Sequence, residues 1–244
     1  MEETKPRIMV GCNLLTQQDS IAYVNHMQMW YNYGKAYQDL QFFSNMPRRQ
    51  PIDVMRNTTA RKALEWECDY IFFYDDDVII PIDGLRKLLK LDVDVAAGLT
   101  FIRTPPFKPM IFEMVREGDN GNLIVMEDYK DKVNEKGIVD CYAVGFSCVL
   151  LKVSALKTVM PPYFMTGSRN TEDVYYCCKL KDVNPSTTIA VDTTISTKHM
   201  LDKMWVDAEN VEKLRKFFAP DEVDLGDRNF SYAKESLRAL ESVA

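Results

Sequence analysis

The sequence contains only two histidines, His26 and His199, and its six cysteines form no C-x-x-C pair. Two histidines exclude a metal site built from several imidazoles, and the cysteine spacing is typical neither of a zinc site nor of a disulfide framework. Most of the cysteines stand in apolar stretches that predict strands or helices, which indicates buried, reduced thiols. We therefore expect a cytoplasmic protein with free thiols.

Long apolar runs are also missing, and none approaches the length of a membrane span. The segment from Met1 to Arg7 is charged and has no apolar core, so no signal peptide is expected. The formal charge of −6 gives no general attraction to nucleic acid or anionic membranes. Five basic residues between Arg48 and Lys62 are a local exception, which a solvated helix face explains better than a polyanion groove.

The composition, 46% hydrophobic and 27% charged over 244 residues, suits one large α/β domain or two small ones. Strands are expected over residues 7–12, 40–43, 70–80, 94–99, 139–151 and 188–192, and helices over 20–40, 52–68, 83–90, 171–180, 207–218 and 232–243. Their alternation predicts a mostly parallel sheet covered by helices. A turn-rich segment, 118–122, between two apolar runs predicts an antiparallel hairpin over residues 110–126.

The aromatic run from Tyr70 to Tyr74 ends in three consecutive carboxylates, Asp75, Asp76 and Asp77. If the chain stays extended there, Asp75 and Asp77 point to the same side. Two like charges that close repel unless a cation lies between them, and Mg²⁺ or Mn²⁺ suits carboxylate oxygens. The simpler alternative is a solvated turn after a strand, and this stretch alone does not decide between the two.

Three later features are ambiguous when each is taken alone. Gly145, inside a predicted strand, marks either a close ligand approach or a bulge. Glu172 and Asp173 open a predicted helix, where capping alone would explain them. His199 follows a predicted strand in a polar loop, where a structural role is commoner than a ligand role.

These features occur in a fixed order: a strand ending in Asp-x-Asp, a glycine-containing strand from Ala143 to Leu151, the Glu172-Asp173 pair and a late histidine. In this order they resemble the nucleotide-sugar glycosyltransferases of the GT-A fold, most closely the inverting family 2 type, over roughly residues 5–205. The resemblance implies an α/β, Rossmann-like three-layer sandwich with a mostly parallel central sheet, a small antiparallel excursion and C-terminal helices. It implies a glycosyltransferase domain over residues 1–206, with a nucleotide-binding half to about 100 and an acceptor half from about 101, and a helical extension over 207–244.

The resemblance also implies roles. Asp77 resembles the direct ligand of a Mn²⁺ or Mg²⁺ ion, Asp75 the residue that contacts the donor's ribose and assists the metal, and His199 the late histidine that joins the metal or the diphosphate. The donor side would further include Cys12, Asn13, Arg56, Asn57 and Asp76. The acceptor side would be formed by Gly145, Phe146 and Ser147, with Trp205 as the nearest candidate for the family's aromatic acceptor motif.

Asp173 is similar to the family's catalytic base, with Glu172 as its neighbour, and the helix dipole would keep Asp173 ionised. The expected reaction is metal-dependent transfer, with inversion, from a nucleoside-diphosphate sugar, UDP-sugar favoured, to an acceptor hydroxyl. The acceptor is left open among small molecules, lipids, glycans, proteins and modified DNA bases, as is the oligomeric state. Without a membrane segment, single transfers by a soluble enzyme fit better than processive synthesis.

Two other functions are weighed against this one. The first is a nucleotide-sugar binding protein of the same fold without turnover, although such a protein need not keep Asp75, Asp77, Asp173 and His199 together. The second is a nucleotidyltransferase, which also uses carboxylates at strand ends. A nucleotidyltransferase would need a glycine-rich, basic phosphate loop near the N-terminus, and the segment from Gly11 to Leu15 lacks one.

Overall fold

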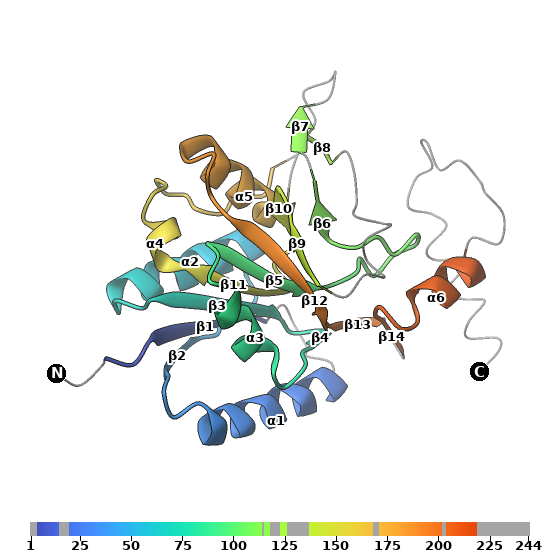
Figure 1. The fold of residues 1–244 in the computed structure, drawn as a ribbon, viewed down its shortest axis with the longest axis horizontal. Helices are drawn as coiled ribbons and strands as arrows, with labels where there is room; N and C mark the ends of the chain where they lie inside the picture. The colour runs from blue at the N-terminus through green and yellow to red at the C-terminus, as the bar shows by residue number, and fades with distance from the viewer. Residues whose placement is uncertain are drawn as a thin grey trace.

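A computed structural model describes residues 4–14, 20–113, 115–117, 123–125, 137–167, 171–201 and 204–218. A seven-stranded sheet in the order β2-β1-β3-β11-β5-β12-β9 forms its centre (Figure 1). These strands are β1 (Arg7–Asn13), β2 (Gln41–Asn45), β3 (Tyr70–Asp75), β5 (Val95–Leu99), β9 (Ile138–Asp140), β11 (Cys148–Lys152) and β12 (Ile189–Ser196). β1, β2 and β3 are mutually parallel, as are β5 and β12, whereas β11 and β9 run antiparallel to their neighbours. The predicted mixed α/β class with a mostly parallel sheet is confirmed.

Helices cover both faces of this sheet: α1 (Ser20–Ala36) and α3 (Gly84–Leu91) on one face, and α2 (Ile52–Glu65), α4 (Val153–Leu156) and α5 (Glu172–Val183) on the other (Figure 1). Because successive strand residues point to opposite faces, alternate residues feed two separate cores. Met9 and Phe73 belong to the core under α2 and α5, whereas Val10 and Phe72 belong to the core under α1 and α3. The result is the predicted three-layer arrangement.

Gly11 explains how closely α2 approaches β1. A Cβ atom at this position would lie 2.8 Å from Thr59 Cγ2 and 2.9 Å from the Phe73 ring, closer than real Cβ contacts. The absence of a side chain at Gly11 therefore lets α2 pack directly on β1. This contact positions Arg56, one turn before Thr59, over the carboxyl end of β3.

Small antiparallel pairings surround the central sheet. β4 (Val78–Ile79), β13 (Lys198–Leu201) and β14 (Met204–Val206) form a three-stranded sheet, β6 (Ile111–Phe112) pairs with β10 (Ala143–Val144), and β7 (Val115–Glu117) pairs with β8 (Leu123–Val125). The hairpin prediction is therefore correct for β7 and β8 but wrong for residues 111–112. The single strand expected over 139–151 is three strands, because the chain leaves the central sheet after β9 to pair with β6.

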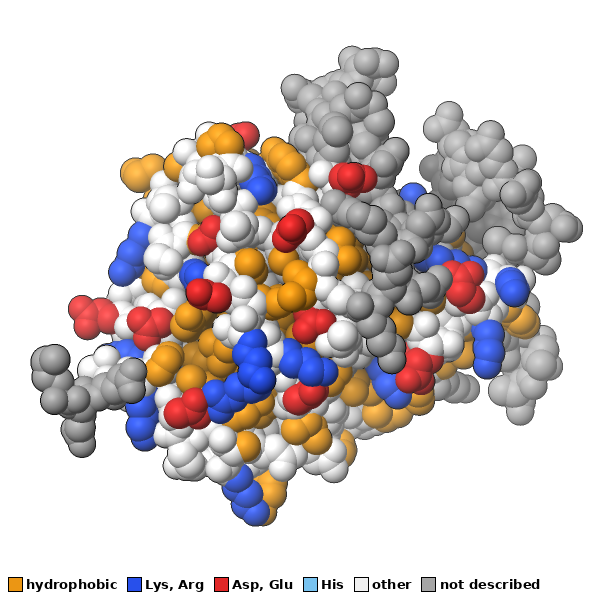
Figure 2. Space-filling model, in the orientation of Figure 1, with side chains coloured by type: hydrophobic (Ala, Val, Ile, Leu, Met, Phe, Trp, Pro, Cys, Tyr) orange, Lys and Arg blue, Asp and Glu red, His pale blue; other side chains and the backbone are white. Residues whose placement is uncertain are grey.

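The predicted C-terminal helix over 207–218 is shorter, α6 (Val211–Phe218), because Asp207 and Asn210 hydrogen-bond each other in the turn before it. The turn over 118–122 and the helix expected over 232–243 lie outside the described residues. All six cysteines are free and five are buried, as their spacing predicts. None of the helices described is both long enough and apolar enough to cross a bilayer. On the face shown in Figure 2, the described acidic and basic side chains are interspersed rather than gathered by sign.

Candidate functional site

One edge of the sheet gathers polar side chains from several strands. β1 ends at Asn13 and β3 ends at Asp75, and these two residues are register partners. The antiparallel strand β11 begins at Cys148 beside Tyr74, so Ser147 arrives at the same edge. Ser147 Oγ donates a hydrogen bond to Asp75 Oδ2 at 2.7 Å. Carboxyl ends of parallel strands are where open α/β sheets bind ligands, so this edge is the candidate site.

Arg56 links this edge to α5. Its Nη2 donates to Asp75 Oδ1 at 3.2 Å, and its Nε donates to Glu172 Oε1 at 2.9 Å. The Arg56 side chain is 2% exposed, and its guanidinium lies over the rings of Phe73 and Phe146. Arg56 therefore does not belong to a surface basic patch, and the basic run in the sequence does not form one continuous basic face.

Burial and charge act against each other in this cluster. Burial lowers the pKa of Arg56, but the carboxylates of Asp75, Glu172 and Asp173 outweigh it and raise the pKa. Burial raises the pKa of Asp75, the nearby charge of Asp77 adds to the rise, and Arg56 opposes it. Two carboxylates are thus held around one buried guanidinium, an arrangement that costs desolvation and is often found at functional sites.

Asp77 lies in a turn rather than on an extended strand. β3 ends at Asp75, and Asp76 and Asp77 turn the chain into β4. The expectation of an extended chain through all three acids is therefore wrong, because β4 leaves the central sheet to pair with β13. Asp77 still lies near Asp75, and its Oδ2 accepts a hydrogen bond from Arg103 Nη1 at 2.6 Å.

His199 lies on strand β13, not in the expected polar loop, because its backbone pairs with Val78 and Val206. Its Nδ1 is 2.7 Å from the Phe101 carbonyl oxygen, and its Nε2 is 3.6 Å from Asp77 Oδ1. A carbonyl oxygen only accepts, so Nδ1 carries a hydrogen, and Nε2 is the ring nitrogen directed toward Asp77. Metal-binding histidines are usually oriented through the opposite ring nitrogen in this way.

The predicted metal ligands are only partly brought together. Among the described residues, no group of three or more His, Cys, Asp or Glu side chains is arranged to hold a metal ion. Asp75 is turned toward Arg56 and Ser147, whereas Asp77 and His199 face each other. Burial raises the pKa of Asp77, but His199, whose Nε2 lies 3.6 Å from Oδ1, and Arg103 outweigh it and lower the pKa. An ionised carboxylate oxygen and an imidazole nitrogen that lie side by side are a pair of ligands that suits Mn²⁺ or Mg²⁺.

Asp173, the expected base, is buried at the start of α5. Its Oδ1 accepts the Val174 backbone N–H at 2.7 Å, and its Oδ2 accepts the Phe146 backbone N–H at 3.4 Å. Burial and the neighbouring charge of Glu172 raise its pKa. This change in pKa is opposite in direction to the one that the positive end of the helix dipole favours. A carboxylate with a raised pKa is a stronger base.

Asn13 and Cys12, both expected on the donor side, differ in their surroundings. The Asn13 side chain is buried, and neither its Oδ1 nor its Nδ2 has a hydrogen-bond partner among the described residues. Buried polar atoms without partners are rare, and a ligand is a common explanation. Cys12 contributes its side chain to the core beneath α1, where burial raises its pKa well above the ordinary value. Asp76 is also buried, and its charge adds to the rise in the pKa of Cys12.

Asn57 has no hydrogen-bonding capacity left for a nucleotide-sugar donor. Its Nδ2 donates to the carbonyls of Asp53 and Phe164, and its Oδ1 accepts the backbone N–H groups of Tyr163 and Phe164. These four bonds use both donors and both lone pairs of the amide. Asn57 therefore ties the segment before α5 to α2.

The residues expected on the acceptor side are also accounted for by packing. A Cβ on Gly145 would lie 2.0 Å from Met110 Cε and 2.9 Å from Met110 Cβ, so the glycine makes room for a side chain of the protein. Phe146 is fully buried and packs on Arg56. Trp205 is half-buried on β14, where its Nε1 donates to Asp207 Oδ2 and its ring carries the Lys198 ammonium at 4.4 Å.

Sequence reasoning missed Arg103 and the link between Ser147 and Asp75. Arg103 follows β5, whose carboxyl end lies at the same edge as those of β1 and β3. Polar residues after every parallel strand of a sheet are candidates for its ligand edge. Applying that rule to β5 as well as to β3 would have included Arg103.

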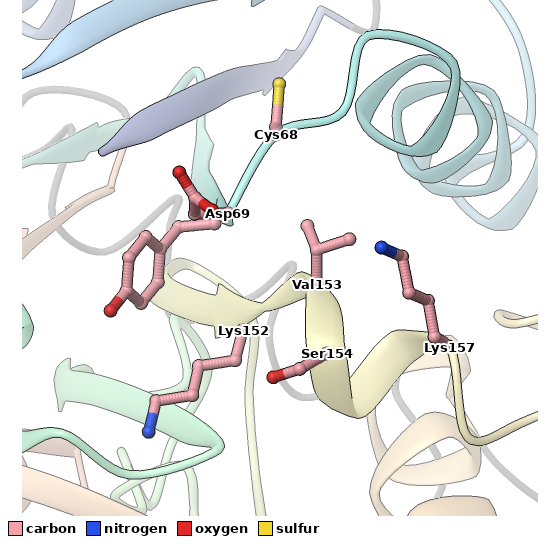
Figure 3. A pocket seen from close by; sticks show the side chains of 7 residues that line it. Cys68, Asp69, Lys152, Val153, Ser154 and Lys157 are labelled. Atoms are coloured by element: carbon pink, nitrogen blue, oxygen red, sulfur yellow. The ribbon is translucent and has the colours of Figure 1, made fainter. Parts of the chain in front are cut away.

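A separate cavity of about 280 Å³ lies at the opposite end of β3 (Figure 3). It is lined by Cys68, Asp69, Tyr70, Lys152, Val153, Ser154 and Lys157. Tyr70 begins β3 and Lys152 ends β11, so the cavity and the carboxylate cluster lie at opposite ends of these paired strands. None of the residues expected to bind the donor, the metal or the acceptor lines this cavity.

No known family model and no curated protein sequence matches the chain. Among solved structures, the chain is similar to A197 from STIV, with a TM-score of 0.56 and 15% identity over 84% of this chain and 91% of A197. At that identity the likeness shows the fold alone. A structure of GalNAc-T7 with UDP, GalNAc and Mn²⁺ is similar with a TM-score of 0.43 and 9% identity, covering 99% of this chain and 55% of that one. The chain thus spans about half of GalNAc-T7, and this weaker likeness carries no argument.

Proposed function

We propose that this protein is a metal-dependent glycosyltransferase that moves a sugar from a nucleoside-diphosphate sugar, a UDP-sugar in the first instance, to an acceptor hydroxyl with inversion. One observation carries the proposal. Asp75, Asp77 and His199 lie at the same sheet edge as Arg56 and the Glu172-Asp173 pair, although they come from four elements and the turn after β3. Packing alone does not require so many costly charges in one place.

The donor's nucleotide is assigned to the carboxyl ends of β1 and β3. The unpartnered amide of Asn13 supports this assignment, because a nucleotide would supply its missing hydrogen bonds. Beside Asp75, Arg56 Nη1 is a third buried atom at this edge that has no hydrogen-bond partner among the described residues. Asp75, held by Arg56 and Ser147, is assigned to the ribose hydroxyls, since a fixed carboxylate oxygen is a good acceptor for them.

Asp77 Oδ1 and His199 Nε2 would hold a Mn²⁺ or Mg²⁺ ion. A divalent ion bound at so few protein ligands keeps other positions for phosphate oxygens and water. When bound, the ion stabilises the negative charge that develops on the departing diphosphate. The hydrogen bond between His199 Nδ1 and the Phe101 carbonyl keeps the imidazole oriented for this role.

Asp173 is assigned to accept the proton of the attacking acceptor hydroxyl. Its raised pKa makes it a stronger base than an ordinary aspartate, and the Val174 and Phe146 backbone amides fix its orientation. The Glu172 carboxylate keeps Arg56 in place between the donor side and this base. For inversion, the hydroxyl attacks from the face of the sugar opposite the diphosphate.

The decisive experiment is hydrolysis of a panel of nucleotide sugars by the purified protein with Mn²⁺, compared with excess EDTA. We expect slow release of sugar from one donor, lost with EDTA and in Asp77→Asn. Full hydrolysis in EDTA would contradict a metal-dependent enzyme. Tight binding of a nucleotide sugar without hydrolysis or transfer would instead identify a binding protein, and release of pyrophosphate from nucleoside triphosphates would identify a nucleotidyltransferase.

A further inference from the structure

Arg103 is a charged residue at the site that the proposed reaction does not yet use. It lies between β5 and β6, with its side chain 54% exposed, and its Nη1 is 2.6 Å from Asp77 Oδ2. The loop that carries it is anchored, because Ile102 donates to the Lys108 carbonyl and Arg215 donates to the carbonyls of Pro106 and Phe107. Arg103 is thus presented to Asp77 by a fixed backbone.

The same loop also orients the second proposed metal ligand. Phe101, two residues before Arg103, supplies the carbonyl that binds His199 Nδ1. Arg103 and His199 therefore approach the two oxygens of one carboxylate, Oδ2 and Oδ1 of Asp77. A divalent cation at Asp77 and the Arg103 guanidinium would both draw on this one negative charge, and they would repel each other.

We propose that Arg103 binds the diphosphate of the donor. Its guanidinium moves from Asp77 to the phosphate oxygens when the divalent ion takes the carboxylate. This inference rests on the proposed function. Arginine suits the role because its planar fork pairs with two phosphate oxygens at once, and the remaining N–H groups of an exposed side chain are available for them. The exchange keeps both cations paired with negative charge.

The inference predicts opposite effects of one substitution on two ligands. Removing Arg103 frees Asp77 for the metal, so Arg103→Ala should bind Mn²⁺ alone about two- to fivefold more tightly, the scale of one exposed ion pair. The same variant should bind UDP or GDP in the presence of Mn²⁺ about 10- to 100-fold more weakly, the scale of a charge-assisted hydrogen bond. Uridine, which lacks phosphates, should be unaffected.

The measurements are Mn²⁺ titration followed by electron paramagnetic resonance and calorimetry with UDP, GDP and uridine. Arg103→Lys should restore Mn²⁺ competition but only part of the diphosphate affinity, because lysine lacks the fork. Arg86→Ala is the matched control, since Arg86 makes an exposed pair with Asp39 away from the site. It should change neither affinity.

The possible outcomes distinguish a failure of this inference from a failure of the proposed glycosyltransferase function. If wild type binds Mn²⁺ and UDP or GDP but Arg103→Ala leaves diphosphate affinity unchanged, the inference is wrong and the proposed function stands. If Arg103→Ala weakens the binding of Mn²⁺ measured without a nucleotide, Arg103 supports the metal site rather than competing with the ion, and the inference is wrong. If wild type binds neither Mn²⁺ nor a nucleoside diphosphate, both proposals are wrong.

Discussion

The two ends of strand β3 present opposite kinds of surface. At its carboxyl end, Asp75 is held by a buried arginine and a buried serine, and burial raises its pKa. At its amino end, Tyr70 borders the cavity of about 280 Å³, where Asp69 accepts the Arg7 backbone N–H. The amino end has the cavity, lined by the buried residues Cys68 and Val153 and by more exposed polar side chains, whereas the carboxyl end has the buried charges.

This difference teaches which observation locates a site. A cavity between a strand end and a short helix follows from the irregular packing of surface side chains and requires no particular chemistry. Buried charges, by contrast, lose hydration and are kept only where partners or function repay the loss. The carboxyl end has such charges in Arg56, Glu172 and Asp173, together with the unpartnered amide of Asn13.

The largest expected effect separates the two ends by metal binding. Asp77→Asn keeps the shape of the side chain but removes the charge that a divalent ion requires, so Mn²⁺ binding should be lost. Asp69→Asn, at the amino end, is the matched change and should bind Mn²⁺ as wild type does. Calorimetry with Mn²⁺ measures both, and circular dichroism checks that both variants fold. Equal Mn²⁺ affinity in wild type and Asp77→Asn would remove the metal from the carboxyl end.

The next largest effect is expected on the transfer rate when Asp173, the proposed base, is replaced. Asp173→Asn should lower the transfer rate by about 10²–10⁴-fold, the usual contribution of a positioned base, while leaving donor and Mn²⁺ affinities nearly intact. The Asn variant keeps the shape but cannot take up the proton. The product's anomeric configuration, read by NMR, should be opposite to that of the donor. Retained configuration, or loss of donor binding with normal transfer at saturation, would exclude this role.

The pH dependence follows from the same residue. A base works only when ionised, so activity falls as pH drops through its pKa. Because burial and Glu172 raise the pKa of Asp173 above its ordinary value of 3.8, the acid limb of the rate profile should lie at higher pH than for an ordinary aspartate. A profile flat down to about pH 4 would contradict the raised pKa.

A third effect compares two arginine–carboxylate pairs. Arg56→Ala leaves Asp75 and Glu172 without their buried partner and should lower the free energy of unfolding by about 3–5 kcal/mol. Arg86→Ala breaks an exposed pair with Asp39 and should cost at most about 1 kcal/mol. Denaturant unfolding measures both. Arg56→Lys keeps the charge and should lie between them, and equal losses for the two alanine variants would mean that the carboxyl end is not specially built.

The order of elements could be predicted from the sequence because it depends on local patterns. The apolar run from Tyr70 to Tyr74 predicted β3, and alternation with helices predicted the mostly parallel sheet. The pairing of β6 with β10 could not be predicted in the same way, because strand partners depend on contacts between residues far apart in sequence.

The chemistry of the site could be predicted only in part from the sequence. Residue type and position at the end of a strand pointed to Asp75 and Asp77, but the turn at Asp76 depends on β4 pairing with β13. Whether a side-chain amide is free or already hydrogen-bonded is also a tertiary property: Asn57 is fully bonded, whereas Asn13 has no partner in the part of the chain that the structure describes. The raised pKa of Asp173 likewise follows from burial, which the helix position alone does not reveal.

The smallest expected effect tests the amino end directly. Lys157, the residue that follows α4, lines the cavity, and its side chain is exposed (Figure 3). Exposed substitutions of this kind usually leave a protein folded and nearly as stable. Lys157→Ala should therefore keep donor hydrolysis within about twofold of wild type, the scale expected where no transition-state contact is lost. Asp77→Asn, measured in the same assay, gives the loss expected at a working site. A tenfold or larger fall in Lys157→Ala, with unchanged unfolding, would mean that the cavity takes part in the reaction and that the two ends of β3 act together.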